Sequence, residues 1–117
     1  MTLAKRVLVV EDQMMIAFAL KDMLTSMGLE CVGPFRSAAD ALNVLDHGAC
    51  DFALLDINLG DTDTSEPVAQ ALVELDIPFV FVTGYGSAAP IDEKFNHVDR
   101  YLKPIRAQDI RAAIQVT

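Results

Sequence analysis

The sequence has no tryptophan, only two cysteines and no long run of apolar residues among its 117 positions. The longest apolar run, Met14 to Leu20, is far shorter than the roughly 20 residues that cross a bilayer, so we expect no membrane span and no membrane partner. Cys31 and Cys50 do not make a disulfide framework in a chain of this size. A reducing compartment, the cytoplasm, is therefore the expected location.

Basic residues are also scarce. Nine lysines and arginines stand against seventeen aspartates and glutamates, which gives a formal net charge of −8 at pH 7. A chain this acidic repels phosphate backbones and anionic lipid, so nucleic-acid binding is not expected. The length suits one domain, and a hydrophobic content of 52% is enough for one ordinary core. We expect residues 1–117 to form a single domain.

Apolar residues follow two periods that alternate along the chain. Short, nearly continuous apolar runs, typical of buried strands, occupy 6–10, 30–35, 52–55, 78–82 and 100–102. Apolar residues at helical spacing occupy 13–27, 37–47, 67–75 and 107–116. The segment 84–95 holds two glycines and Pro90, so a helix there is expected to be short or irregular. This alternation predicts an α/β fold with a doubly wound, five-stranded parallel sheet and helices on both faces.

Polar side chains follow four of the predicted strands, at the edge where such sheets place their sites. In chain order they are Glu11, Asp12, Asp56, Thr83 and Lys103. Three carboxylates brought together raise one another's pKa unless a cation lies among them, and oxygen ligands of this kind suit Mg²⁺. Asp56 would then attack phosphorus as a carboxylate nucleophile, while Lys103 and Thr83 bind the phosphoryl oxygens. The residues predict an aspartate that accepts a phosphoryl group.

Four segments, VLVVEDQ, LLDINLG, FVTGYG and YLKPI, occur in this order at the ends of the predicted strands. Through them the chain, from Leu3 to Ala113, resembles the receiver domain of two-component response regulators. The resemblance implies a flavodoxin-like (βα)5 fold in which Asp56 is phosphorylated by a histidine kinase or a phosphotransfer protein. Such a domain promotes only its own phosphorylation and dephosphorylation and is not an enzyme acting on other substrates.

The resemblance also implies a ligand set and two backbone features. Mg²⁺ is expected to be held by Glu11, Asp12, Asp56 and the backbone carbonyl of Asn58. The backbone of Gly84 is expected to border the phosphoryl group, and the peptide bond before Pro104 is expected to be cis.

The segment from Phe81 to Gly86 resembles a narrower branch of receivers, common in alphaproteobacteria and marked by a Phe-Ala-Thr-Gly-type motif. Receivers of this branch are often stand-alone and tend to pair with kinases of the HWE or HisKA2 type. The resemblance therefore implies such a kinase as the phosphodonor. It also implies a downstream protein partner, bound on the face built from the fourth helix, the fifth strand and the last helix.

One position departs from the family pattern. Most receivers carry an aromatic residue three positions before the lysine, where it switches between exposed and buried forms. That position is Arg100 in this chain, and Tyr101 lies only two positions before Lys103. Because strand side chains alternate between faces, Tyr101 is expected to point the other way unless a bulge intervenes. Tyr101 is thus a candidate switch residue, with ordinary core packing as the alternative.

Two other functions are weighed against the receiver. A phosphorylation-independent interaction module of the same fold is favoured by the offset of Tyr101 and opposed by the complete acidic, threonine and lysine set. The residues Asp61-Thr-Asp63 superficially resemble the nucleophile motif of haloacid-dehalogenase-type phosphatases, but that nucleophile must end a strand, and Asp61 lies five residues beyond Asp56. A metal-dependent hydrolase would also need a second catalytic base, for which the sequence gives no signal.

Overall fold

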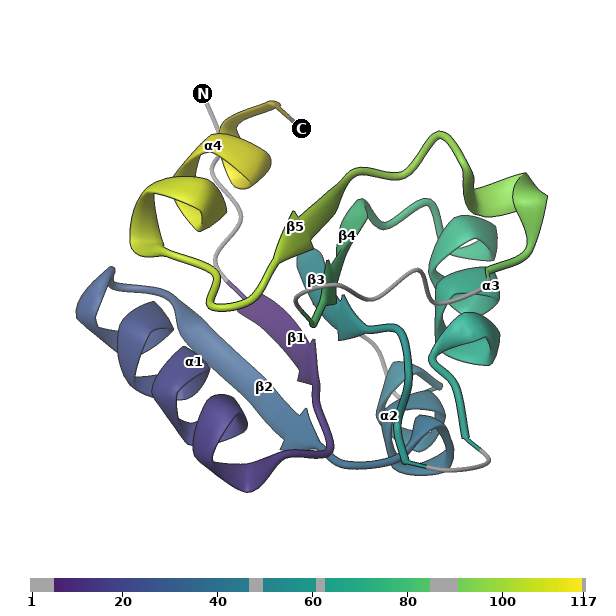
Figure 1. Ribbon diagram of the computed structural model, residues 1–117, viewed down its shortest axis with the longest axis horizontal. Coiled ribbons are helices and arrows are strands. Elements are labelled where there is room, and N and C mark those ends of the chain that lie inside the picture. Colours follow the sequence, from purple (N-terminus) through teal and green to yellow (C-terminus); the bar gives the residue numbers. More distant parts are fainter. Residues whose placement is uncertain (1–5, 47–49, 61–62, 85–90, 117) are drawn as a thin grey trace.

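The computed structural model describes residues 6–46, 50–60, 63–84 and 91–116 of the chain (Figure 1). Five parallel strands form one sheet in the order β2-β1-β3-β4-β5. They are β1 (Arg6–Val10), β2 (Glu30–Phe35), β3 (Phe52–Asp56), β4 (Phe79–Thr83) and β5 (Arg100–Leu102). The predicted α/β fold with a five-stranded parallel sheet is confirmed.

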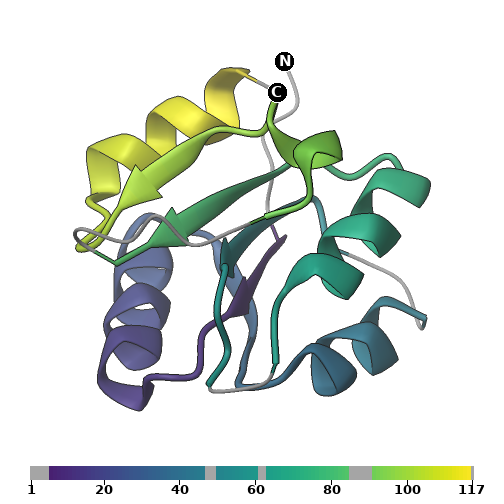
Figure 2. The same cartoon turned by 45° about the vertical axis from the view of Figure 1, so that its right-hand side comes forward.

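Helices cover both faces of the sheet (Figure 2). They are α1 (Met14–Ser26), α2 (Ala38–Leu45), α3 (Glu66–Glu74) and α4 (Ala107–Val116). The helices α1 and α4 lie on one face, and α2 and α3 lie on the other. None of the helices in the described part of the chain has the length and apolar content of a membrane span.

The central strands are buried on both faces because their side chains alternate between two apolar clusters. In β1, Leu8 and Val10 join the cluster under α2 and α3. Val7 and Val9 join the cluster under α1 and α4. All five residues of β3 are buried. This two-sided burial explains why these strands are continuous apolar runs in the sequence.

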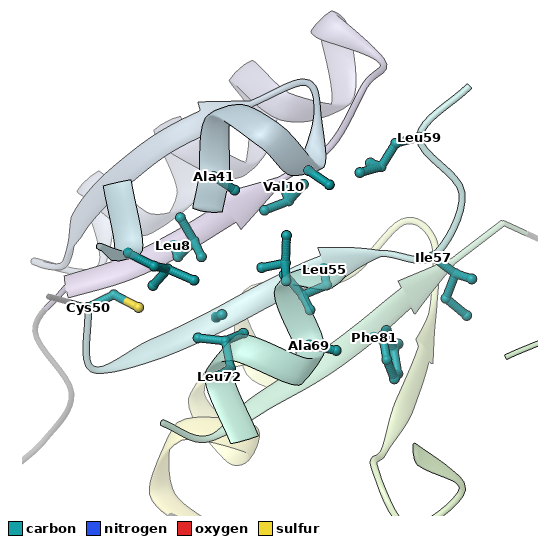
Figure 3. Close-up of a cluster of buried hydrophobic side chains, with 14 of the residues drawn as sticks. Leu8, Val10, Ala41, Cys50, Leu55, Ile57, Leu59, Ala69, Leu72 and Phe81 are labelled. Carbon is teal, nitrogen blue, oxygen red and sulfur yellow. The ribbon is translucent and has the colours of Figure 1, made fainter. Parts of the chain in front are cut away.

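The cluster under α2 and α3 also takes in the connection between β4 and β5. Figure 3 shows Leu55 and Phe81 of the sheet facing Leu72 of α3. The ring of Phe95 lies edge-on to Phe81, with 6.1 Å between centroids. Phe95 ends η1 (Glu93–Phe95), a single turn of 3-10 helix. The described residues between β4 and β5 contain no α-helix, which confirms the expected irregularity there; residues 85–90 lie outside the described part.

The ends of several elements differ slightly from the prediction. β3 includes Asp56, and β4 lies one residue later than expected because Thr83 pairs with Leu102 of β5. α2 ends at Leu45, two residues earlier than predicted, and residues 47–49 lie outside the described part. Ser37 caps this helix as its position suggests, since its Oγ accepts a hydrogen bond from the backbone N–H of Asp40 at 3.2 Å.

Candidate functional site

The carboxyl ends of β1 and β3 bring three acidic side chains together. Glu11 and Asp12 follow β1, and Asp56 is the last residue of β3. Each of these three carboxylates has an oxygen within 4.8 Å of the other two. β1 and β3 are neighbours in register, so the cluster follows directly from the parallel pairing of the two strands. The structure therefore assembles the acidic set that the sequence predicted.

Lys103 joins this cluster from the end of β5. Its Nζ lies 2.8 Å from Oε1 of Glu11 and donates a hydrogen bond to Oδ2 of Asp56 at 3.1 Å. The backbone N–H of Lys103 donates to the carbonyl of Thr83 at 2.8 Å, which fixes the start of the loop after β5. The peptide bond between Lys103 and Pro104 is cis. A lysine at the outer strand thus reaches across β4 to two acids of the central strands.

Hydrogen bonds hold both the side chain and the backbone of Glu11. Its side chain is 1% exposed, and its second oxygen, Oε2, accepts a hydrogen bond from the backbone N–H of Gln13 at 3.1 Å. Its own N–H donates to the carbonyl of Phe35, at the end of β2, at 2.9 Å. β2 reaches this position through a bulge, where Gly33 has a φ of 106°. The end of β2 therefore positions the first acid of the site.

Burial and charge shift the titration of the two groups that meet at the site. The pKa of Asp56 is raised to about 7, first because burial disfavours the carboxylate and then because the Glu11 charge lies nearby; Lys103 opposes both effects. The pKa of Lys103 is raised above its ordinary value, because the hydrogen bonds and charges of Glu11 and Asp56 outweigh the effect of burial. Lys103 therefore keeps its positive charge at neutral pH, whereas Asp56 exists there as a mixture of the carboxylate and the carboxylic acid.

The acidic cluster fits a hard divalent cation. Lys103 carries one positive charge against the three carboxylates of Glu11, Asp12 and Asp56. The groups offered are all oxygens, which Mg²⁺ prefers, and Asp12 is half-buried, so the cluster is not sealed from solvent. The donor set and its excess of negative charge therefore suit Mg²⁺.

Three further predicted residues lie around the cluster. Thr83 is the last residue of β4 and is 5% exposed. Gly84 follows it, and a Cβ added there meets no atom within 4 Å, so the space beside its backbone is open. Asn58 lies two residues beyond β3, is exposed and forms an isolated antiparallel bridge with Thr64. The ligand role of the Asn58 carbonyl stays a prediction.

Tyr101 does not lie with this set. It pairs with Val82 in the uninterrupted register of β4 and β5, and it packs against the cluster under α1 and α4. Thr83 is the next residue after Val82, so its side chain points to the opposite face. The offset that the sequence showed is therefore not corrected by a bulge.

One polar contact near the site had no signal in the sequence. Oδ2 of Asp63, in the loop after β3, accepts a hydrogen bond from the backbone N–H of Ala38 at the start of α2, at 3.1 Å. These residues are 25 positions apart, and Ser37 already supplied the expected cap for α2. Only the folded arrangement of the two loops shows the contact.

Comparison with known proteins gives a consistent family. The sequence model of the response regulator receiver domain matches residues 7–115. The chain is 31% identical over 111 residues to the response regulator protein TmoT of Ectopseudomonas mendocina, covering 92% of this chain and 50% of TmoT. It is 30% identical over 118 residues to TodT of Pseudomonas putida F1, covering 96% of this chain and 50% of TodT. The chain thus spans about half the length of these curated relatives.

Solved structures give the same answer over almost the whole chain. The solution structure of SdrG from Sphingomonas melonis Fr1 has a TM-score of 0.84 and 37% identity, covering 98% of this chain and 97% of that one. The BeF3-activated conformation of SdrG from Pseudomonas melonis Fr1 has a TM-score of 0.78 and 36% identity, with the same coverage. With the acidic cluster, threonine and lysine at the ends of a five-stranded parallel sheet, the chain belongs to the family of response regulator receiver domains.

Proposed function

We propose that Asp56 of this receiver domain accepts a phosphoryl group and that the phosphorylated domain acts as a switch or a phosphate sink in two-component signalling. The observation that carries the proposal is the position of the Asp56 carboxylate, 3.1 Å from the ammonium of Lys103 and within 4.8 Å of two other acids. Asp56 is 8% exposed, so little bulk water contacts it, and it lies at the carboxyl end of β3 beside the half-buried Asp12.

The chemistry follows from these side chains. A carboxylate oxygen of Asp56 forms a bond to phosphorus, and the bond between phosphorus and the donor's nitrogen or oxygen breaks, which leaves an acyl phosphate on Asp56. The ammonium of Lys103 offsets negative charge on the phosphoryl oxygens, and the Thr83 hydroxyl and the Gly84 backbone bind them. When water attacks the same phosphorus, the bond between phosphorus and the Asp56 oxygen breaks, inorganic phosphate leaves and Asp56 returns to its carboxylate form.

A cation completes the proposed site. Glu11, Asp12, Asp56 and the backbone carbonyl of Asn58 would hold Mg²⁺, whose positive charge offsets that of the phosphoryl oxygens. The carboxylate of Glu11 is fixed by Gln13 and Lys103, so it contributes a preorganised negative charge. Asp12 is half-buried and contributes from the solvent side of the cluster.

The proposed phosphodonor is a sensor histidine kinase or a phosphotransfer protein. Receivers take their phosphoryl groups from such phosphohistidine donors, and the Phe81-Val-Thr-Gly84 segment favours a kinase of the HWE or HisKA2 type. We also propose a downstream protein partner, with neither nucleic acid nor membrane as a target, because the chain carries a net charge of −8. Both cysteines are free thiols, as suits the cytoplasm.

A second candidate is an interaction module that works without phosphorylation. The observation that favours it is the placement of Tyr101, which packs on the face away from Thr83 and so leaves the usual aromatic position to Arg100. Such a module would keep the fold and its partner surface while the phosphoryl group changes nothing.

Mass spectrometry of the intact protein separates the two. The domain is incubated with acetyl phosphate, with and without Mg²⁺, as wild type, as Asp56→Asn and as Asp22→Asn, in which an exposed acid of α1 is changed. We expect one added phosphoryl group in wild type and Asp22→Asn with Mg²⁺, and none in Asp56→Asn. Equal labelling of Asp56→Asn refutes the assignment of Asp56. Mg²⁺ binding without any labelling by acetyl phosphate or by a kinase favours the second candidate.

A further inference from the structure

In the loop that follows Asp56, backbone hydrogen bonds join the residues just after β3 to those just before α3. The backbone N–H of Ser65 donates to the carbonyl of Ile57 at 3.0 Å, and that of Leu59 donates to the carbonyl of Asp63 at 2.9 Å. Between these two bonds, Asn58 faces Thr64 in an antiparallel bridge. The Asn58 backbone therefore lies between two hydrogen bonds that join the two sides of the loop.

This loop contacts the rest of the protein through Leu59 and Asp63. The side chain of Leu59 is 6% exposed and packs in the cluster under α2 and α3. Next to it, the Asp63 carboxylate accepts the backbone N–H of Ala38 at 3.1 Å. The Leu59 contact is apolar and non-directional, whereas the Asp63 contact is a directed hydrogen bond to a charged group, a kind that is stronger than a hydrogen bond between neutral groups.

The Asp63 contact is more than a second cap on α2. The first turn of a helix has several backbone N–H groups without partners, and Ser37 satisfies the one on Asp40 from within the same segment. Asp63 satisfies the one on Ala38 from a loop 25 residues away. The positive end of the α2 dipole adds to the attraction for its carboxylate. Of these two caps, the one from Asp63 links the loop after β3 to α2, whereas the one from Ser37 lies within a single segment.

We propose that Asp63 is a positioning residue for the metal and phosphoryl site. Its carboxylate fastens the loop after β3 to the start of α2 and thereby holds the Asn58 carbonyl where a cation bound at Asp56 meets it. Asp63 acts through the backbone that connects it to Asn58 and is not itself a ligand. This inference rests on the proposed function, because it takes the Asn58 carbonyl to be a ligand of the Mg²⁺ site.

The coupling has to work in both directions. If the contact between Asp63 and Ala38 strengthens Mg²⁺ binding, then Mg²⁺ binding must strengthen that contact by the same factor. In the wild-type protein, Mg²⁺ should therefore slow hydrogen exchange at the Ala38 amide. The Asp40 amide, which is bonded to Ser37, should change much less.

The first experiment compares two caps on one helix. Asp63→Ala and Ser37→Ala each remove one side-chain acceptor from the first turn of α2, at a similar cost in stability of the fold. Mg²⁺ affinity is measured for both by titration calorimetry on the metal-free protein. We expect the dissociation constant to rise about fivefold to tenfold in Asp63→Ala, the size of one ordinary net hydrogen-bond contribution, because only part of the lost contact is coupled to the metal, and to stay within about twofold of wild type in Ser37→Ala. Asp63→Asn keeps an acceptor oxygen and should recover most of the affinity.

Hydrogen exchange gives the second readout, and its wild-type part does not depend on a variant that folds. The Leu59 and Ser65 amides should exchange faster in Asp63→Ala than in Ser37→Ala, and the wild-type Ala38 amide should gain protection on addition of Mg²⁺. Equal affinities for Asp63→Ala and Ser37→Ala, or an unchanged Ala38 amide, overturn the role of Asp63. In that case, Mg²⁺-dependent phosphorylation of Asp56 still stands. Absence of Mg²⁺ binding in wild type overturns both.

Discussion

The side chains of Thr83 and Tyr101 lie on opposite faces of the sheet, because Tyr101 pairs with Val82 and Thr83 pairs with Leu102. A movement of the Tyr101 ring toward the Thr83 hydroxyl would therefore have to cross from one face of the sheet to the other, so we expect Tyr101 not to act as the switch. Tyr101 packs with the residues under α1 and α4, where we expect it to contribute to stability.

Substitutions at Thr83 and at Tyr101 should therefore affect different properties, the first the phosphorylation rate and the second the stability. Thr83→Ala should slow phosphorylation by acetyl phosphate about tenfold or more, since it removes the hydroxyl that we propose binds the phosphoryl oxygens. Tyr101→Leu should leave the rate within about twofold of wild type and lower the free energy of unfolding by about 1 to 2 kcal/mol. Initial rates by intact mass and urea denaturation followed by circular dichroism measure both. A Tyr101→Leu rate as low as that of Thr83→Ala contradicts the assignment.

Asp56 should destabilise the metal-free protein above neutral pH. Its pKa is 3.8 for the free side chain and about 7 in the folded protein, so between these values the folded state keeps a proton that the unfolded state has released. The free energy of unfolding therefore falls as pH rises from about 4 to about 7 and then levels off. Asp56→Asn removes this effect and should be more stable than wild type by about 1 to 3 kcal/mol at pH 8.

The comparison is made in a chelator at pH 5 and pH 8. At pH 5 part of the advantage of Asp56→Asn is already present, because the unfolded wild-type protein has released a proton that the folded protein keeps; the advantage should be smaller than at pH 8 by about 1 to 2 kcal/mol. Asp22→Asn serves as the control and should show no such pH-dependent difference. A loss of stability in Asp56→Asn at pH 8 would mean that the pairing with Lys103 outweighs burial and the charge of Glu11.

Removal of Lys103 should make the protein depend on a divalent cation. Lys103→Met leaves the buried carboxylates of Glu11 and Asp56 without their shared ammonium. We expect a loss of about 2 to 4 kcal/mol at pH 8 in a chelator, and a larger stabilisation by Mg²⁺ than wild type shows. Lys21→Met on the exposed face of α1 is the matched control. Losses that are the same with and without Mg²⁺ would show that the lysine acts through packing alone.

The bulge in β2 should be sensitive to a single methyl group. A Cβ on Gly33 would lie 2.8 Å from the backbone nitrogen of Phe35 and 3.0 Å from the carbonyl of Val9, at a φ of 106°. Gly33→Ala should therefore cost about 2 to 4 kcal/mol and disturb the Phe35 carbonyl that holds Glu11.

A matched control for this change is Gly28→Ala, just after α1. Gly28 also has a positive φ, but an added Cβ there meets nothing within 4 Å. Its cost should be about 1 kcal/mol, from the backbone conformation alone. Chemical denaturation of both variants measures the difference, and equal costs would show that the bulge can absorb a side chain.

The sequence predicts the fold well because the central strands β1, β3 and β4 are buried on both faces. Even the three-residue strand Arg100–Leu102 has its predicted bounds, since the surrounding pattern leaves room for one more strand. Errors occur at ends, as in β4, where pairing of Thr83 with β5 adds a residue that apolar character does not mark. The parallel sheet also predicts which polar residues meet, because strands of one direction share an edge.

The hydrogen bonds around the site are less predictable. The contact between Asp63 and Ala38 depends on how two loops approach after folding, and neither residue type marks it. Likewise, the bond from the Glu11 N–H to the Phe35 carbonyl follows the bulge at Gly33, and no residue type marks it in the sequence. Periodicity in a sequence reports burial, and directed polar contacts between distant loops have no period.

The single positive charge of Lys103 only partly neutralises the carboxylates around it. Three carboxylates and one ammonium leave two negative charges uncompensated when all four groups are ionised. A phosphodonor is itself an anion, so it is repelled on approach until a cation has been taken up, and this repulsion weakens as salt rises. Divalent ions would therefore govern how often donor and receiver meet, and not only how fast they react once they have met.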